Sequence, residues 1–523
     1  MIRSPLAAVL VLSGTLSAQE PLKPVVSTPP SSFVVQEASV SGIHTELATG
    51  MIDCAELTKA YLRRIEAYDD RGPKLNAILT VNPRAHEIAE ELDQAYALSG
   101  LGGRPLHCVP VILKDNYNTS DLPTTGGSTT LARSVPRKDA FIVERLKQAG
   151  AVIIAKANLT ELARGGTTVS SLGGQTRNPY DLTRTPGGSS GGTGAAIAAS
   201  FGVLGTGSDT GQSTRSPASA QSLVGIRPTR GLLSRSGIIP RSFTQDEAGP
   251  ITRTVEDAAR MLDVIVGYDP ADPITAFSVD KIPSSYTAFL DHDGLRGARV
   301  GLLLDFLGEQ AVHREVNSVM EIVAETMTGM GATVVPIRIP KLVELTRDIA
   351  LSEFEGKSAF NRYLEDLGSS APVTTLQEFI VRGEFHPSIR PSLEADQRRD
   401  DGLKDPEYRI RILRRDDLRT AVMTVMAENE LDAILYPHQR RLVVPIGEEQ
   451  VERNGVLSNS TGFPAITVPG GFSAPMASAP IGVPIGIELL GPEWSEPTLI
   501  SLAYAFEQAT RIRRSPVSTP SLR

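Results

Sequence analysis

The chain has 523 residues, of which 41% are hydrophobic and 21% charged, and its formal net charge is −8. This composition is typical of an ordinary globular protein, and the lack of a basic surplus argues against nucleic acid as a partner. By length alone there is room for more than one domain, and the 46 glycines and 37 prolines indicate long, shaped loops.

The N-terminus has the pattern of a secretory signal peptide. Arg3 gives a short positive region, residues 6–12 are apolar, and Ala18 ends a stretch of small polar residues. We expect cleavage after residue 18, export to the periplasm or the medium, and a Pro/Ser-rich lead segment over 19–39. A buried N-terminal helix is the alternative. No later apolar run is long enough to span a bilayer.

Helices and strands then alternate along the first third of the chain. Helical spacing predicts helices over 53–68 and 84–98. The strand-like run "CVPVILKD" (108–115) is followed by a helix over 139–150 and the strand "AVIIAKAN" (151–158). Because "AVIIA" has no polar alternation, we expect a strand covered on both faces, as in an α/β sheet.

The same rhythm continues to the C-terminus. A short helix of small residues is expected over 193–202, and Thr254 and Asp257 have the capping-box spacing that begins a helix over 254–267. After these come a Pro/Asp-rich linker (268–285), strands over 298–305 and 332–340 with a helix between them, and a charged helical insertion or lid (345–430). The last elements are strands over 431–437, 465–472 and 484–491, a helix with Leu499, Leu502, Ala503 and Phe506 on one face, and a flexible tail (514–523).

Cys54 and Cys108 are the only cysteines in the sequence. Export permits a disulfide between them, but two cysteines make neither a disulfide framework nor a metal cluster. Cys54 lies on the apolar face of the first predicted helix and Cys108 lies beside an apolar run, so we expect both to be buried.

A glycine–serine stretch, "TPGGSSGGTG" (185–194), matches two motifs whose context is missing. Its glycines have the spacing of a phosphate-binding P-loop, but Thr193 stands where that motif needs lysine. Residues 187–191 also match the G-x-S-x-G elbow of esterases. Both motifs need a strand that leads into the loop, and "NPYDLTRTP" is polar and broken by proline. The histidines available as a base for such an esterase, none of them in a telling context, are His292, His313, His386 and His438.

Lys114 ends an apolar run in "VPVILKDN" (109–116). An ammonium group is costly to bury unless it is paired or neutral. Lys114 therefore extends its amine to solvent, pairs with Asp115, or has a lowered pKa. A desolvated lysine can deprotonate a serine hydroxyl, directly or through another hydroxyl, without a histidine. Serines are abundant in 185–194 and in "GTGSDTGQSTRSPAS" (205–219), which we expect to be a second loop of small residues.

In these motifs the chain resembles the amidase signature family of serine hydrolases. The resemblance covers about residues 40–513 and includes "LVGIRPTRGLLSRSGIIP", "QDEAGPITRTVEDAARMLDV" and "GFPAITVPGGF". It implies a single large α/β domain over 40–513, with a mixed central sheet flanked by helices. It also implies hydrolysis of a small-molecule carboxylic amide with no metal or organic cofactor. The sequence does not distinguish a monomer from a homodimer.

The resemblance further implies a Ser–cis-Ser–Lys triad. Lys114 matches the family's lysine, Ser189 the bridging serine after a cis peptide bond, and Ser213, 24 residues later, the nucleophile. Neutral Lys114 takes a proton from Ser189, which takes one from Ser213 as it attacks the amide and forms an acyl-enzyme. The oxyanion hole is then made by the backbone N–H groups of Thr210, Gly211, Gln212 and Ser213. The resemblance also implies that Ser190, Asp209 and Arg215 hold this loop through hydrogen bonds and an ion pair.

Two residues depart from the family pattern. Gln212 stands where relatives usually have glycine, so a position that needs positive φ would be strained and the oxyanion hole altered. Cys108 also replaces a common glycine. Three alternatives stay open: a glutamine-hydrolysing amidotransferase A-type subunit, a G-x-S-x-G esterase, and a non-catalytic binding protein on this scaffold. Substrate specificity is expected to come from residues 345–460.

Overall fold

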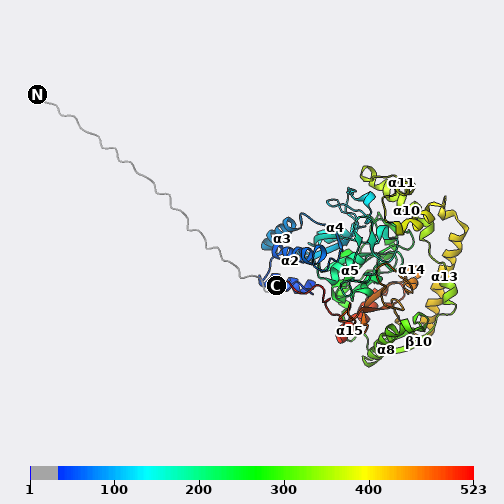
Figure 1. Cartoon of the computed structure of the whole chain (residues 1–523). Helices are drawn as coiled ribbons and strands as arrows, with labels where there is room; N and C mark the ends of the chain where they lie inside the picture. The colour runs from blue at the N-terminus through cyan, green and yellow to red at the C-terminus, as the bar shows by residue number, and fades with distance from the viewer. Residues whose placement is uncertain (2–32, 523) are drawn as a thin grey trace.

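A mixed sheet of eleven strands runs through the molecule (Figure 1). The computed structural model describes residues 33–522 and Met1, so the expected signal peptide beyond Met1 and the lead segment up to residue 32 lie outside the described residues. From one edge to the other, the strands are β1 (Ile78–Val81), β3 (Val152–Ala157), β2 (Pro110–Lys114), β6 (Leu204–Asp209), β8 (Glu247–Thr252), β7 (Val224–Arg227), β12 (Ala465–Phe472), β13 (Pro484–Leu490), β11 (Ala433–Pro437), β9 (Arg299–Leu303) and β10 (Thr333–Ile337). The predicted α/β class and single continuous sheet are confirmed.

Strand direction changes along the sheet. β2 is parallel to both β3 and β6, and β9 is parallel to β10 and β11. Between these two parallel groups, every pair from β6 through β8, β7, β12 and β13 to β11 is antiparallel. Because β2 and β6 are parallel, their carboxyl ends meet at the same edge, where the candidate site lies.

Helices cover both faces of the sheet. Those outside the insertion are α1 (Val40–Thr49), α2 (Cys54–Ile65), α3 (Ala85–Ser99), α4 (Phe141–Gln148), α5 (Gly191–Ala198), α6 (Arg215–Ala220), α7 (Val255–Ile265), α8 (Arg314–Gly329), α14 (Val456–Thr461) and α15 (Glu496–Thr510). Thr254 caps α7 as predicted, accepting from the Asp257 N–H. The apolar face predicted for α15 is buried.

Small residues let α5 lie directly on the sheet. All eight residues of α5 are buried. A Cβ at Gly192 would overlap the backbone of Asn158 at the end of β3, so only glycine fits there. The glycine–serine stretch is therefore shaped by close helix–sheet packing, and within the described chain no strand lies between β5 (Gly174–Gln175) and α5.

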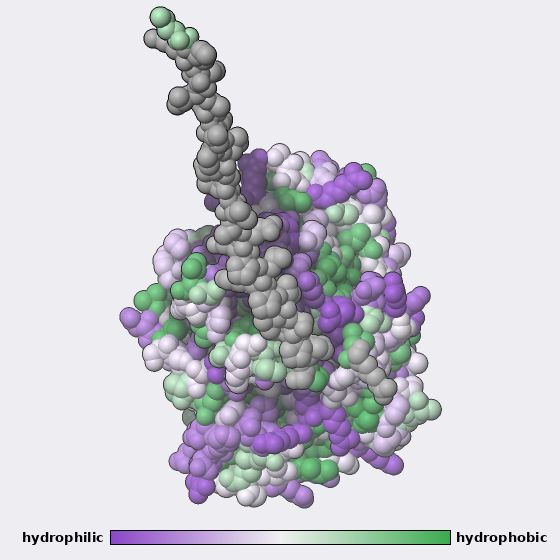
Figure 2. All heavy atoms as spheres, turned by 90° about the vertical axis from the view of Figure 1, so that its left-hand side faces the viewer, coloured by the Kyte–Doolittle hydropathy of each residue, from purple (hydrophilic) through white to green (hydrophobic). Residues whose placement is uncertain are grey.

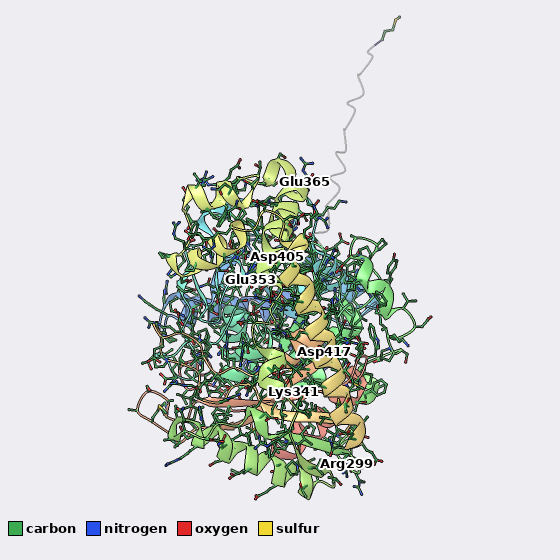
Figure 3. All side chains as sticks on the ribbon, turned by 90° about the vertical axis from the view of Figure 1, so that its right-hand side faces the viewer. Arg299, Lys341, Glu353, Glu365, Asp405 and Asp417 are labelled. Atoms are coloured by element: carbon green, nitrogen blue, oxygen red, sulfur yellow. A yellow bond between two sulfur atoms is a disulfide. The ribbon has the colours of Figure 1, made fainter. Side chains whose placement is uncertain are left out.

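The charged insertion is helical, as predicted. It consists of α9 (Leu342–Thr346), α10 (Ser352–Leu367), α11 (Leu376–Arg382), α12 (Arg390–Gln397) and α13 (Pro406–Glu428). Aromatic and aliphatic residues of α10–α12, among them Phe360 and Phe379, form a separate hydrophobic cluster together with Leu131, Leu162 and Ile239. Figure 3 shows α13 crossing this side of the molecule from Asp405 to Asp417, with Glu353 and Glu365 of α10 near its upper end.

Three segments differ from the sequence-based expectation. Residues 205–219 are not one loop, because they contain most of β6 and most of α6. The linker 268–285 includes a 3₁₀ helix at Pro273–Ser278. The segment expected to be a flexible tail is held along 514–522, where the Arg64 guanidinium donates to the carbonyls of Thr519 and Pro520; Figure 1 shows the C-terminus beside the N-terminal helices.

None of the helices formed by the described residues is both long and apolar enough to pass through a bilayer. On the face drawn in Figure 2, hydrophilic side chains are interspersed with smaller hydrophobic groups.

Candidate active site

Lys114 lies at the carboxyl end of β2, beside β6. Its backbone N–H donates to Thr206 Oγ1 at 2.9 Å, and its side chain is fully buried. The Nζ atom lies 2.7 Å from Ser189 Oγ, 2.8 Å from Ser208 Oγ and 3.2 Å from the Ser208 carbonyl oxygen. The alternative pairing of Lys114 with Asp115 is wrong, because the Asp115 carboxylate pairs with Lys156 at 3.0 Å.

Burial favours the neutral form of Lys114. It lowers the pKa of the amine to about 7, although the charges of Asp209 and Asp246 act in the opposite direction. A neutral amine has two N–H donors and one lone pair. The carbonyl and hydroxyl oxygens of Ser208 can accept those two hydrogens, which leaves the lone pair for the Ser189 hydroxyl.

The loop before α5 presents Ser189 to this amine. The Gly188–Ser189 peptide bond is cis, and Gly187 has φ 73°, a conformation that favours glycine. Ser189 and Ser190 are fully buried. The Ser189 carbonyl accepts from the Thr160 N–H at 3.0 Å, and the Ser190 N–H donates to the Ser213 carbonyl at 3.2 Å. This last bond holds the Ser189 loop against the loop that carries Ser213.

Ser213 lies at the open end of this arrangement. It is 7% exposed, whereas Lys114 and Ser189 are 0% exposed. Within residues 33–522, its hydroxyl makes no hydrogen bond, and the N–H groups of Gly211, Gln212 and Ser213 donate to no partner. Free donors beside a free hydroxyl can stabilise charge on an oxygen bound next to Ser213.

Gln212 is not strained in the way that its sequence position suggests. Positive φ is found at sixteen non-glycine residues of the described chain, and Gln212 is not among them. Its side chain is directed to Gly455, whose N–H donates to Gln212 Oε1 at 3.3 Å.

Cys108, the second residue that departs from the family pattern, does have a positive φ. Its φ of 63° is the left-handed conformation that explains a glycine preference at this position.

A buried charge network holds the Ser213 loop from behind. Burial alone would raise the pKa of Asp209, but the guanidiniums of Arg215 and Arg227 hold it well below its usual range. Arg215 pairs with Asp209 Oδ2 at 3.1 Å and with Glu488 Oε1 at 2.5 Å. It also donates to the Gly211 carbonyl at 2.8 Å. The network thereby links the sheet to the backbone that precedes Ser213.

We expect Asp209→Asn to lower the free energy of unfolding by about 3–5 kcal/mol, because it leaves two buried guanidiniums without their shared carboxylate. Urea unfolding followed by circular dichroism measures this. The matched control is Asp293→Asn, which removes an ion pair with Arg296 that is 70% and 76% exposed at its two side chains and should leave stability nearly unchanged. Equal stability of the two variants would contradict a structural role for the Asp209 network.

Several residues of the site are not predicted from the sequence. Ser208 contacts Lys114 directly and also accepts from Asn116 Nδ2 at 2.9 Å. Glu488 accepts from Tyr436 at 2.7 Å and lies 2.7 Å from His438 Nδ1. A carboxylate inside the apolar run "PIGIELLG" is the same kind of signal as Lys114 and was available in the sequence.

The esterase alternative lacks its base. Among residues 33–522, no histidine hydrogen-bonds with Ser189 or Ser213, and a G-x-S-x-G elbow needs a histidine there.

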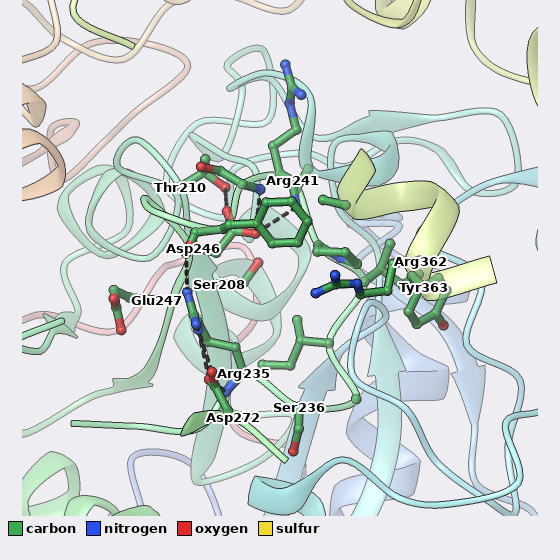
Figure 4. Close-up of a pocket in the computed structure, with 18 of the residues that line it drawn as sticks. Ser208, Thr210, Arg235, Ser236, Arg241, Asp246, Glu247, Asp272, Arg362 and Tyr363 are labelled. Atoms are coloured by element: carbon green, nitrogen blue, oxygen red, sulfur yellow. Dashed lines mark hydrogen bonds and ion pairs between the residues drawn. The ribbon is translucent and has the colours of Figure 1, made fainter. Parts of the chain in front are cut away.

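A cavity of about 280 Å³ opens beside the site (Figure 4). Ser208 and Thr210 lie on its wall, and Thr210 donates to Asp246 at 2.6 Å. The opposite wall comes from the insertion, where Arg362 and Tyr363 of α10 line the space. The cavity has charged groups and apolar surface and meets the site at Ser208 and Thr210, so it is suited to the organic part of a substrate.

Cys54 and Cys108 are fully buried, as predicted, and they are joined by a disulfide. Together with His107 they form a group whose ligand-type atoms lie within 4.8 Å of one another. Both sulfur atoms belong to the disulfide, so they do not act as thiolate ligands.

Comparisons with known proteins agree with this architecture. The family model described as Amidase matches residues 56–500. A probable amidase of Arabidopsis thaliana is 36% identical over 508 residues, covering 93% of this chain and 92% of the relative. The A-type subunit of a glutamyl-tRNA(Gln) amidotransferase from Exiguobacterium sp. is 35% identical over 486 residues, covering 90% and 97%. The crystal structure of a peptide amidase from Stenotrophomonas maltophilia superposes with a TM-score of 0.82 at 36% identity, covering 92% and 98%.

Proposed function

The chain belongs to the amidase family and is an amide-hydrolysing enzyme, and from this premise we propose that it acts through an acyl-enzyme on Ser213, with Lys114 and Ser189 as the proton relay. The observation that carries the proposal is the pattern of contacts around a buried lysine, whose lone pair is left for the Ser189 hydroxyl.

In the first step, neutral Lys114 takes the proton of Ser189 while Ser189 takes that of Ser213. The Ser213 oxygen attacks the amide carbonyl, and the negative charge that develops on the carbonyl oxygen is stabilised by the N–H groups of Thr210, Gly211, Gln212 and Ser213. One such donor contributes about 3–4 kcal/mol to transition-state stabilisation. The support for this step is that three of these donors have no partner within the described chain.

In the second step, the proton returns through Ser189 to the leaving nitrogen, and the C–N bond breaks. Water then attacks the acyl-enzyme, with the relay accepting its proton, and releases the carboxylate. Because the amine departs from the side of Ser189, we place the leaving group near the 187–190 loop and the acyl group in the cavity beside Thr210.

This mechanism predicts a pH profile with one limb on the acid side. Lys114 must be neutral, and burial lowers its pKa to about 7. We expect kcat/KM to rise about tenfold per pH unit up to about pH 7 and then to level off. Rates on a neutral amide between about pH 5 and pH 9 measure this; a profile flat across that range would contradict a lysine base with this pKa.

The proposed activity is tested by a panel of primary amides, anilides, esters and carbamates, with release of amine and acid measured by mass spectrometry. Hydrolysis of a carbon–nitrogen bond supports the proposal, and the absence of turnover by folded protein on the whole panel overturns it. The amidotransferase relatives make free glutamine a necessary member of the panel. Glutamine hydrolysis that exceeds all other rates would favour an amidotransferase-type role instead.

Export is a separate proposal. It is supported by the signal-like N-terminus and by the Cys54–Cys108 disulfide, whose Cα atoms are 5.3 Å apart, because such bonds persist in oxidising compartments. Expression of the full chain followed by N-terminal sequencing tests it. A mature protein that begins after about residue 18 supports export, and an intact N-terminus on protein recovered from the cytosol contradicts it.

A further inference from the structure

Arg453 carries a guanidinium that makes no direct ion pair with a described residue, although the charge of Asp209 acts on it. It lies in the loop between β11 and α14, and its side chain makes no hydrogen bond or ion pair with any residue between 33 and 522. By contrast, Arg215 and Arg227 behind the site share Asp209. Burial lowers the pKa of Arg453 to about 10, so the group stays charged at neutral pH.

The backbone under Arg453 is fixed. Arg453 pairs with Gln439 in an isolated β-bridge, and the next N–H, that of Asn454, donates to the His438 carbonyl at 2.7 Å. The Asn454 side chain donates to the Pro437 carbonyl at 2.8 Å. These contacts hold the backbone from which the Arg453 side chain extends, and a fixed backbone favours specific recognition.

In space, a single residue, Gly166, lies between the Arg453 guanidinium and the loop that carries Ser189. A Cβ built on Gly166 would overlap its Nη1 and would lie 2.9 Å from Cζ and 3.2 Å from Nη2. On its other side Gly166 touches Gly188, because a Cβ on Gly188 would lie 2.7 Å from the Gly166 carbonyl carbon. Gly188 directly precedes Ser189, so a positive charge stands beside the loop that delivers the proton to the leaving nitrogen.

The same stretch of chain also contacts the Ser213 loop. Gly455, two residues after Arg453, donates to Gln212 Oε1, and a Cβ on Gly455 would lie 2.5 Å from the Gln212 Cβ. Arg453 is thus placed between the Gly166–Gly188 contact and the residue before Ser213. No carboxylate of the described chain forms an ion pair with Arg453, and Asp209, whose charge acts on it, is paired with Arg215 and Arg227.

We propose that Arg453 binds a carboxylate on the leaving group, so that the preferred substrates are N-acylated amino acids with a free carboxylate. The Arg453 guanidinium is partly buried and makes no hydrogen bond within the described chain, and a carboxylate ligand satisfies it through two parallel N–H···O bonds. The leaving-group side follows from the Ser189 loop, while the acyl group extends into the cavity beside Thr210. This inference rests on the proposed hydrolysis at Ser213.

The test compares two amides with the same acyl group, N-benzoylglycine and neutral N-propylbenzamide, by release of benzoate. We expect the wild-type enzyme to cleave N-benzoylglycine with a kcat/KM at least about tenfold higher. Arg453→Gln should lower that value by about tenfold or more, mainly through KM, and leave the rate on N-propylbenzamide within about twofold. A merely structural role would lower both rates together.

Two further variants keep the result interpretable. Gly166→Ala retains the charge but pushes the guanidinium aside, so it should also weaken the preference for N-benzoylglycine. Arg441→Gln is the matched control, because Arg441 lies in the same loop but its side chain is 30% exposed and lies 3.9 Å from the carboxylate of Glu452. This variant should prefer N-benzoylglycine over N-propylbenzamide to the same degree as the wild type.

Wild-type protein that cleaves N-propylbenzamide as fast as N-benzoylglycine, or that cleaves neither, contradicts the inference. Labelling by a fluorophosphonate then separates two cases. If Ser213 is still labelled, the proposed mechanism stands and only the substrate class falls. If Ser213 is not labelled, the proposed function falls as well.

Discussion

Ser213→Ala is expected to abolish amide hydrolysis while leaving the protein folded. Removal of a serine nucleophile costs roughly four to six orders of magnitude in kcat, because no other group forms the acyl-enzyme. Only the hydroxyl is lost, and in the described chain it makes no hydrogen bond, so the thermal midpoint should change little. Stopped assays with product detection by mass spectrometry measure the residual rate.

The matched control is Ser216→Ala, three residues further along. The Ser216 hydroxyl is buried and makes no hydrogen bond within the described part of the chain, so its removal should leave turnover close to that of the wild type. If Ser213→Ala kept more than about 1% of the wild-type rate, Ser213 would not be the nucleophile. In that case Ser189 would be the next residue to replace.

Lys114→Met is expected to lower kcat/KM by about 10³-fold or more at neutral pH, since general base catalysis contributes about 10²–10⁴-fold. Methionine fills similar space in the fully buried position without an amine. The distinctive result is the pH profile. Because the group whose pKa burial lowers to about 7 is gone, the residual rate should no longer fall as the pH drops through 7.

The comparison of pH profiles separates a base from a packing residue. A variant that loses activity but keeps the wild-type acid limb would show that Lys114 only supports the structure. Ser208 offers a graded control: Ser208→Ala removes one acceptor at 2.8 Å from the amine but leaves the carbonyl at 3.2 Å. A partial loss, smaller than that of Lys114→Met, is the expected outcome.

Sequence patterns predict the elements whose apolar residues are continuous or periodic. β2, β3, β12 and β13 have runs of β-branched and aliphatic residues, and α7 and α15 have one clear apolar face. β6, with the sequence "LGTGSD", and β8, "EAGPIT", do not follow that pattern. Small residues allow α5 and neighbouring strands to pack closely there, so burial is achieved without large apolar side chains.

The candidate site was predictable only where chemistry and chain position coincide. Lys114 is conspicuous because a charge ends an apolar strand, and the roles of Ser189 and Ser213 come from the family resemblance. Ser208 could not be assigned, because its contact with Lys114 depends on the pairing of β2 with β6. Arg453 has no local signal at all: its significance comes from Gly166, far away in sequence, and from the absence of a partner within the described residues.

The most direct test of the account is active-site labelling of the purified protein with a fluorophosphonate, followed by peptide mass spectrometry, with Lys114→Met treated in parallel. The account predicts a single modified residue, Ser213, and much slower modification in the variant. Modification at Ser189, or no modification of protein that is active on amides, would contradict a Ser213 nucleophile activated by Lys114.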